Sequence, residues 1–325
     1  MPVELEHFRV ADLPAIAISN DALRVAVVPE IGGKIISLTS RRTGREWLWT
    51  NSQIPLRRPP LDATDFSLYD CGGWDEIFPT VNPCSLSNTG WGTRQLTDHG
   101  ELWSRPWQIL AAERTATHAS LTLSLADPVL PFRFTRTFTL THDSPTLVAD
   151  YELTNLSTQP LPYLWAAHPL IAIEPGDQLH LPPGTRVSST GILGREVDSA
   201  SLSFSWPQLP LTSGDAIDLS TVPAPTANFA AKLFAENVST GSVAITNSTT
   251  RESLALSFNT AAIPHVALWL NFNAWSGASS SPYFNAGIEP TTTPADNLHL
   301  AATQHTARQL APQSTTTWQL NLTVG

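Results

Sequence analysis

The sequence predicts an all-β protein of antiparallel strands, and three observations support this fold class. Apolar and polar residues alternate with a period of two in several segments, which is typical of strands with one buried face. No stretch of about twelve residues has both the apolar spacing and the end caps of an amphipathic helix. The chain is also rich in threonine and contains 27 prolines, and these residues favour strands and interrupt helices respectively.

The first strands are expected near the amino terminus. Residues 23–27 carry alternate apolar side chains and precede a turn at 29–33. Residues 35–39 and 46–50 flank the turn residues Thr43, Gly44 and Arg45. We therefore predict a hairpin between these two segments.

The middle of the chain carries the clearest alternation. In residues 132–141 every second side chain from Phe132 is Phe, Arg or Leu, and the others are Thr and one Arg. A turn at 142–145 leads into a second alternating run at 147–153, which predicts a hairpin. Further strands are expected at 243–245, 254–258 and 318–324.

The chain is predicted to form one domain over residues 1–325. No change in composition marks a linker, and no repeat of fixed period is present. Long loops are expected at 51–100, 171–191 and 273–296. Because loops on a rigid sheet often carry binding residues, these segments are candidates for a functional site.

Composition limits the possible partners. The net charge is −10 and only 14% of residues are charged, against about 25% in typical soluble domains. An acidic surface repels phosphate backbones and anionic lipids, so we expect neither nucleic acid nor membrane partners. Neither the two cysteines, Cys71 and Cys84, nor any other residues have metal-ligand spacing, and no nucleotide-binding loop is present. We expect no cofactor or metal and, without a signal peptide, a cytoplasmic location.

Three segments concentrate residues that a plain β-sandwich does not need. They are residues 69–107, 164–170 and 286–296. In order they contribute the following motifs: Asp98-His99-Gly100 with Arg105-Pro106-Trp107, then His168-Pro169, then Glu289-Pro290 with Pro294-Ala295-Asp296. An earlier hairpin reads Gly32-Gly33-Lys34-Ile35-Ile36-Ser37-Leu38.

This ordered set resembles the aldose 1-epimerase (galactose mutarotase-like) superfamily from about Asp21 to the end of the chain. The resemblance implies a β-supersandwich of large, twisted antiparallel sheets with a carbohydrate site in a concave face. It also implies an enzyme that interconverts the α and β anomers of a free sugar. Glu289 matches the family's base, His168 its acid and His99 a histidine that contacts sugar oxygens. The expected partner is therefore a small-molecule carbohydrate.

The residue types alone, apart from any resemblance to a family, also suit acid–base chemistry. Opening a cyclic hemiacetal requires one group that accepts a proton and another that donates one, and a carboxylate with an imidazole is a natural pair near neutral pH. The alternative for Glu289 is a structural ion pair with Arg251 or Arg308. The alternative for His168 is a histidine in the protein core.

Further substrate-binding candidates each have a structural alternative. Asp75 and Glu76 follow Trp74 and could bind sugar hydroxyls or cap a turn. Arg105 could reach a sugar oxygen or stack on Trp107.

Tryptophans and lysines complete the set of candidates. Trp74, Trp103 and Trp269 could include a platform on which a sugar stacks, or could all belong to the core. The chain has only two lysines, Lys34 and Lys232, and Lys34 is expected to lie in a solvated turn.

Three functions remain open from the sequence. The first is a mutarotase, and the second is a non-catalytic carbohydrate-binding protein of the same fold. The third is a glycoside hydrolase or lyase in which Glu289 pairs with Asp75 or Glu76. Carboxyl groups about 5 Å apart would indicate retention of configuration, and separations of about 6.5 Å or more would indicate inversion.

Overall fold

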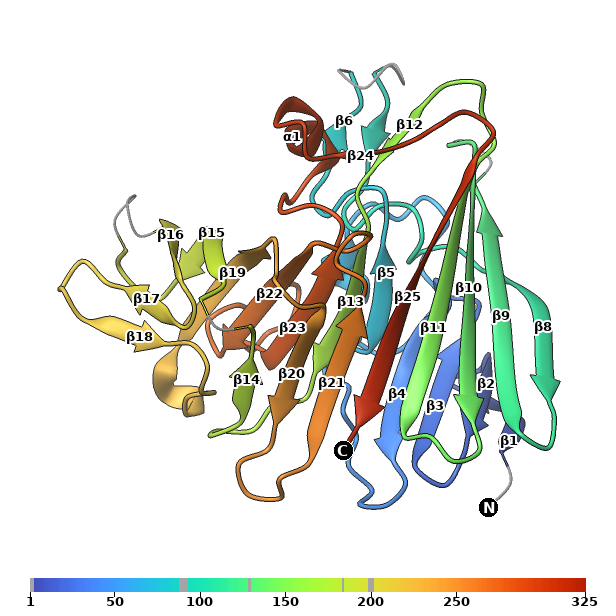
Figure 1. Cartoon of the computed structure of the whole chain (residues 1–325), viewed down its shortest axis with the longest axis horizontal. Coiled ribbons are helices and arrows are strands. Elements are labelled where there is room, and N and C mark those ends of the chain that lie inside the picture. The colour runs from blue at the N-terminus through green and yellow to red at the C-terminus, as the bar shows by residue number, and fades with distance from the viewer. Residues whose placement is uncertain (1–2, 88–92, 128–129, 183, 198–201) are drawn as a thin grey trace.

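The computed structural model describes residues 3–87, 93–127, 130–182, 184–197 and 202–325, and these are dominated by two large antiparallel sheets (Figure 1). The larger sheet has 11 strands. In spatial order they are β1 (Glu4–Val10), β2 (Leu13–Ser19), β3 (Leu23–Val28), β4 (Lys34–Ser40), β5 (Trp74–Ile77), β13 (Ala166–Ile171), β23 (Phe284–Thr291), β22 (His265–Phe272), β19 (Phe229–Glu236), β15 (Arg186–Leu193) and β16 (Ser203–Ser205).

The second sheet has eight strands and packs on one face of the first. In order they are β14 (Gln178–His180), β20 (Ser242–Thr246), β21 (Ser253–Phe258), β25 (Thr315–Val324), β11 (Thr146–Asn155), β10 (Phe132–Thr141), β9 (His118–Ala126) and β8 (Gln108–Arg114). This arrangement confirms the predicted all-β class and the large antiparallel sheets.

Smaller elements connect the sheets. The paired short strands are β12 (Leu161–Tyr163) with β24 (Arg308–Leu310), β17 (Gln208–Pro210) with β18 (Ala216–Asp218), and β6 (Cys84–Ser85) with β7 (Gln95–Leu96). The helical segments are η1 (Phe66–Tyr69), η3 (Pro225–Ala227) and α1 (Leu298–Thr303). Among the described residues no helix is both long and apolar enough to cross a membrane.

Alternation predicted the strands of the smaller sheet well. β10 covers the expected residues 132–141, and its Phe and Leu side chains are buried while the intervening threonines are partly exposed. It pairs with β11 as the predicted hairpin, and β20 pairs with β21 in the same way. One face of this sheet is therefore core and the other faces solvent, as period-two patterning requires.

Three predictions near the amino terminus and in the loops differ from the structure. Residues 46–50 form no strand, and the predicted hairpin with 35–39 is reduced to one antiparallel bridge between Thr39 and Glu46, while β4 pairs along its length with β3. The predicted loop at 273–296 contains β23, and the predicted loop at 51–100 contains β5. Both strands are buried on their two faces, so neither shows alternation.

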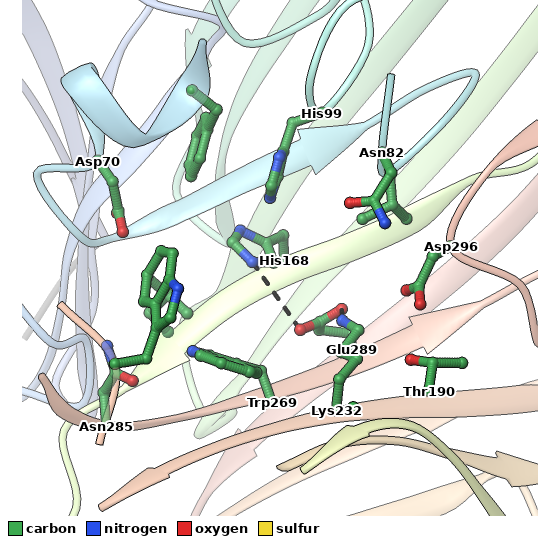
Figure 2. A pocket seen from close by; sticks show the side chains of 15 residues that line it. Asp70, Asn82, His99, His168, Thr190, Lys232, Trp269, Asn285, Glu289 and Asp296 are labelled. Atoms are coloured by element: carbon green, nitrogen blue, oxygen red, sulfur yellow. Dashed lines mark hydrogen bonds and ion pairs between the residues drawn. The ribbon is translucent and has the colours of Figure 1, made fainter. Parts of the chain in front are cut away.

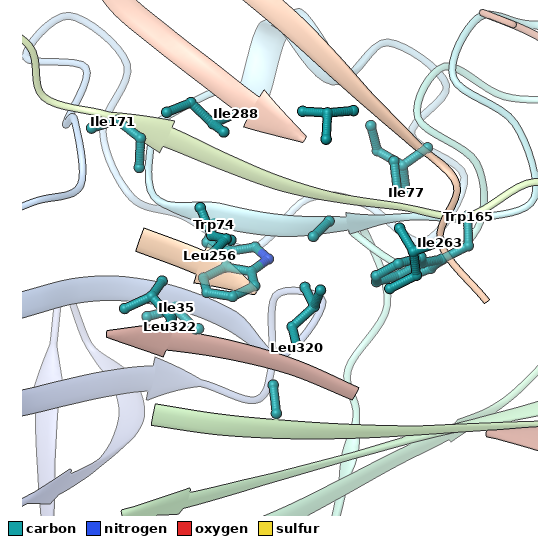
Figure 3. Close-up of a cluster of buried hydrophobic side chains, with 14 of the residues drawn as sticks. Ile35, Trp74, Ile77, Trp165, Ile171, Leu256, Ile263, Ile288, Leu320 and Leu322 are labelled. Atoms are coloured by element: carbon teal, nitrogen blue, oxygen red, sulfur yellow. The ribbon is translucent and has the colours of Figure 1, made fainter. Parts of the chain in front are cut away.

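The space between the two sheets is filled by apolar side chains. Figure 3 shows Trp74 of β5 among Leu256, Leu320 and Leu322 of the smaller sheet, and all four are buried. Trp74 has no exposed surface, so it belongs to this core and not to a sugar-binding surface. The prediction that it contacts substrate is therefore corrected.

Candidate functional site

The central strands of the larger sheet bring three polar side chains into one row. Asp75 of β5 lies directly opposite His168 of β13. The pairs Ala166 with Thr291 and Leu170 with Gly287 place Glu289 of β23 opposite His168 on the other side. Opposed residues of antiparallel strands share a face, so the row faces away from the second sheet.

A cavity of about 310 Å³ opens over this row (Figure 2). Its polar lining comes in similar parts from strands β13, β15, β19, β22 and β23 and from the surrounding loops. The polar and aromatic side chains that line it are Phe66, Asp70, Asn82, His99, His168, Thr190, Lys232, Trp269, Trp275, Asn285, Glu289 and Asp296. Four sequence-predicted site residues therefore meet in one cavity: Glu289, His168, His99 and Trp269.

Glu289 and His168 face each other across the floor of this cavity. Glu289 Oε1 lies 3.8 Å from His168 Nε2 and makes no hydrogen bond within the described residues. Glu289 Oε2 accepts a hydrogen bond from Lys232 Nζ at 2.7 Å. The expected structural pairs with Arg251 or Arg308 are absent from the described ion pairs, and Lys232 takes their place. One carboxylate oxygen is thus held and the other is free.

Gly287 provides the space for the free oxygen. A Cβ atom at this position would lie 2.6 Å from Glu289 Oε1 and 3.1 Å from the Trp269 side chain. Any larger residue would therefore push the carboxylate away from its present place. The glycine, two residues before Glu289 on the same face of β23, is part of how the sequence shapes the cavity floor.

His168 is neutral in this environment. Burial, together with the positive charges of His99, Lys232 and Lys34, lowers the pKa of His168 well below its ordinary value. Its Nδ1 atom is buried and has no hydrogen-bond partner within the described residues. The imidazole can therefore act as a neutral donor or acceptor toward a ligand, and it is not an imidazolium at neutral pH.

His99 lies at the rim of the cavity above His168. Its ring stacks on Phe66 at 4.0 Å and meets the His168 ring edge to face at 5.0 Å. The Asp98 carboxylate lies 2.9 Å from His99 Nδ1. This contact fixes the ring so that its other nitrogen points toward the cavity (Figure 2).

Aromatic side chains wall the cavity at two ends. Trp269 and Trp275 meet edge to face at 5.4 Å, and both are partly exposed. Phe66 closes the end beside the two histidines. Aromatic walls around a polar floor suit a ligand such as a sugar, which has apolar C–H faces and hydroxyl edges.

Several polar groups around the cavity have capacity for a ligand. Asn285 is fully buried, and neither its amide oxygen nor its nitrogen has a partner within the described residues. Asp70 is buried near one end, and Gly72 N–H donates to its Oδ1 at 3.1 Å. Burial raises the pKa of Asp70 despite the nearby charge of Lys34. Asp296, Thr190 and Asn82 line the opposite end (Figure 2).

Glu76 does not belong to this cavity, which corrects its predicted role. It faces the second sheet, where Arg136 donates to Oε1 at 2.6 Å and Tyr151 donates to the same oxygen at 3.0 Å. Trp165 Nε1 donates to Oε2 at 2.8 Å. Adjacent residues of a strand point to opposite faces, so Asp75 and Glu76 cannot both reach the cavity.

Asp75 lies on the cavity side of the sheet but is not among the lining residues. Lys34 Nζ donates to its Oδ2 at 2.5 Å and to the carbonyl of Gly72 at 2.7 Å. Lys34 is buried, so the expectation of a solvated lysine was wrong. Although burial opposes it, the charges of Asp75 and Asp70 raise the pKa of Lys34 above its ordinary value. The pair therefore forms one end of the row, next to His168.

Arg105 also lies away from the cavity. Its guanidinium contacts Glu101 at 3.0 Å and Asp127 at 3.4 Å. The guanidinium stacked near the Trp107 ring is that of Arg136, at 5.3 Å. Arg105 is not among the residues that line the cavity, and the described cation–π contacts do not include one between Arg105 and Trp107. Trp103, a further stacking candidate, is buried.

Sequence reasoning missed Lys232, Asp70, Asn285 and Asp296. A usable signal existed for Lys232, because it interrupts the apolar run of β19 and the chain has only one other lysine. Asp70, Asn285 and Asp296 occur in segments already singled out or adjoining them, but nothing in their spacing separates them from loop residues. Within the described ranges, no group of three or more His, Cys, Asp or Glu side chains is arranged to hold a metal ion.

Comparisons with known proteins agree with this architecture. A family described as a domain of unknown function, DUF5107, matches residues 9–86. No curated protein matches the chain in sequence. Solved structures align over nearly the whole chain. The Slr1438 protein from Synechocystis sp. PCC 6803 has a TM-score of 0.65 and 16% identity, with 100% of this chain and 96% of that chain covered.

Two further structures carry informative names. A galactose mutarotase-like protein from Clostridium acetobutylicum aligns with a TM-score of 0.64 and 14% identity, covering 100% of this chain and 99% of that chain. A galactose mutarotase related enzyme from Lactobacillus acidophilus aligns with a TM-score of 0.61 and 16% identity, covering 95% and 96% respectively. At sequence identities of 14–16%, the similarity to these structures establishes the fold of this protein and nothing about its activity. The protein therefore has the galactose mutarotase-like fold, as its motif order predicted.

Proposed function

We propose that this protein interconverts the α and β anomers of a free sugar, with Glu289 as the base and His168 as the acid. The observation that carries the proposal is the free Oε1 atom of Glu289, which faces His168 Nε2 at 3.8 Å inside the cavity. The hydroxyl oxygen and the ring oxygen of a cyclic sugar are bonded to the same anomeric carbon. A carboxylate and an imidazole this close together can therefore reach both oxygens from one side.

The proposed reaction needs two proton transfers. Glu289 Oε1 takes the proton of the anomeric hydroxyl, and His168 gives its Nε2 proton to the ring oxygen as the bond from that oxygen to C1 breaks. C1 becomes an aldehyde carbonyl. Rotation about the C1–C2 bond presents its other face to the same hydroxyl, and the reverse transfers close the ring as the opposite anomer.

A neutral His168 is compatible with this role. A neutral imidazole serves as the electrophile in a known isomerase site, where its lowered pKa prevents it from being an imidazolium. When the neutral ring gives its Nε2 proton to the ring oxygen it becomes an imidazolate, and the positive charges of Lys232 and Lys34, which already lower the pKa of His168, stabilise that anion. The acid step therefore does not require protonation of His168 beforehand.

The alternatives have weaker support. A hydrolase that pairs Glu289 with Glu76 or Asp75 lacks its second carboxylate, because both of these side chains are engaged by Arg136 and Lys34. A non-catalytic binding protein would use the same aromatic walls. It would have no need for a buried carboxylate oxygen without a partner beside a buried imidazole, since such groups cost stability.

The experiment is a rate measurement on single anomers. Freshly dissolved α anomers of neutral aldoses, uronates and sugar phosphates are followed by polarimetry with and without the protein. The proposal predicts that at least one sugar reaches equilibrium at a rate proportional to the protein concentration. If no sugar in the panel equilibrates faster than in buffer, while binding to some of them is detected calorimetrically, the non-catalytic alternative holds.

A further inference from the structure

Both lysines of the chain pair with carboxylates in the row of polar residues beneath the cavity, Lys34 in a buried position and Lys232 in a partly buried one. Lys34 pairs with Asp75 at 2.5 Å, and Lys232 pairs with Glu289 at 2.7 Å. Burying a lysine is costly unless its charge is paired. Of the two, only Lys232 lines the cavity, and its side chain remains 16% exposed.

We propose that Lys232 is a positioning residue that places its positive charge on one oxygen of Glu289 and directs the other oxygen toward His168. The inference rests on the proposed function and deepens it. It gives Lys232 a role that neither the sequence motifs nor the similarity in fold indicates.

The sheet geometry allows Lys232 to reach this carboxylate from two strands away. Lys232 on β19 lies opposite Trp269 on β22, and Glu289 on β23 lies opposite Ala267 on β22. Neighbouring strands are about 4.8 Å apart, so Lys232 and Glu289 must span about 10 Å between them. The small side chain of Ala267 leaves room for the ammonium group to cross β22. A larger residue there would block the ion pair.

Lys232 is also the only lysine or arginine among the described residues that line the cavity. The other ionisable groups around Glu289 are His168 from β13 and, from the loops, His99, Asp70 and Asp296. The Lys34 and Asp75 pair lies beyond His168. Without Lys232, a buried carboxylate would share the cavity with two other carboxyl groups. Burial and like charges both favour the protonated form, which cannot act as a base.

The contact leaves the functional oxygen free, which distinguishes it from a purely structural pair. Lys232 engages Oε2 alone, and the Oε1 atom keeps its place between His168 and the space above Gly287. A carboxylate that rotates freely would divide its time between both oxygens. A fixed carboxylate presents one oxygen in the geometry that proton transfer requires.

The test compares Lys232→Met, which keeps the length of the side chain and removes its charge, with Lys232→Arg, which keeps the charge. The kcat and KM of anomer interconversion are measured from pH 4.5 to 9 on the sugar that the panel identifies. Lys232→Met is expected to lower kcat more than it raises KM, and to move the acidic limb of the profile upward by about 1–3 pH units. Lys232→Arg should keep the position of the limb.

A second measurement does not depend on catalysis. The ¹³C signal of the Glu289 side-chain carboxyl, assigned by its loss in Glu289→Gln, is followed against pH in the wild type and in Lys232→Met. The carboxyl is expected to take up its proton at higher pH in the variant. Lys34→Met is the matched control, because it removes the other buried lysine without touching Glu289 and should leave this signal nearly unchanged.

The outcomes separate the two proposals. If Lys232→Met lowers kcat equally at all pH values and the carboxyl titrates as in the wild type, Lys232 is structural and the inference is wrong. If the wild type interconverts no anomers, the proposed function fails, and the carboxyl titration still decides whether Lys232 controls the charge of Glu289. Should Lys232→Met not fold, Lys232→Gln replaces it in both measurements.

Discussion

Two buried glutamates on central strands of the same sheet have opposite surroundings. Both oxygens of Glu76 are engaged, Oε1 by Arg136 and Tyr151 and Oε2 by Trp165. Glu289 is equally buried and equally paired with a cation, yet its Oε1 has no partner within the described residues. Glu76 faces the second sheet, and Glu289 faces the cavity.

The difference shows which kind of buried charge marks a functional site. Burial and an ion pair are common to both glutamates, so neither property identifies the site. The free oxygen beside a solvent-accessible cavity does, because an unsatisfied buried acceptor costs free energy that a ligand can recover. Glu76 thus links the two sheets, and the free oxygen of Glu289 supports the proposal that this residue acts on the ligand.

The largest expected effect is a loss of stability when Glu76, the glutamate that faces the second sheet, loses its charge. Glu76→Gln leaves the fully buried Arg136 without its carboxylate, and removing one partner of a buried ion pair typically costs about 3–5 kcal/mol. The free energy of unfolding, measured by urea denaturation, should fall by this amount. The double variant Glu76→Leu with Arg136→Met should recover much of it, because the unpaired charge is gone. A stable Glu76→Gln protein that has lost activity would instead give Glu76 a functional role.

Strand alternation explains why the sequence could not separate these two glutamates. At residues 132–141 one face is buried and one is wet, so the pattern predicts both the strand and its faces. On β5 all four residues are buried, and Asp75 and Glu76 look alike in the sequence although they point to opposite faces. Glu289 was identified through its motif. The partnership of Lys232 with Glu289 depends on strand order, which local patterns do not contain.

The second largest expected effect is a fall in kcat when the free oxygen of Glu289 is displaced. Gly287→Ala puts a methyl group 2.6 Å from Oε1, closer than nonbonded contact allows, and the flexible carboxylate is expected to move. A displacement of about 1 Å in a catalytic group can cost about 10²-fold in rate. Stability should hold or rise slightly, because alanine suits a strand interior better than glycine. Equal kcat values for Gly287→Ala and the wild type would contradict the described geometry.

A smaller effect is expected at the aromatic wall. Trp269→Ala removes the ring that faces the cavity and meets Trp275 at 5.4 Å. Losing an aromatic contact worth about 0.5–1.5 kcal/mol should raise KM by roughly 2–13-fold and leave kcat within a few-fold. Trp318→Phe, in the core between the sheets, is the control and should leave KM unchanged. An unaltered KM in Trp269→Ala would remove this ring from the binding surface.

The smallest effect is a pH dependence of stability. Because the folded state lowers the pKa of His168 well below that of the unfolded chain, the unfolded state binds the proton more readily. This contribution to stability is complete above about pH 6.5 and is lost as the pH falls toward the lowered pKa. His168→Gln should flatten that part of the curve, and the exposed His7→Gln should not. If His168→Gln leaves the wild-type curve unchanged, the pKa of His168 does not differ between the folded and unfolded states, which would contradict the lowered pKa described above.

The most direct test of the central claim is the rate of anomer exchange at equilibrium with wild-type protein and with Glu289→Gln, measured by magnetisation transfer between the two C1 protons of the sugar. Removing the general base should lower the protein-catalysed rate by about 10²–10⁴-fold in a protein that remains folded, as circular dichroism checks. Catalysis by Glu289→Gln at the wild-type rate would show that the free carboxylate oxygen is not the base, and the account of the cavity would be wrong.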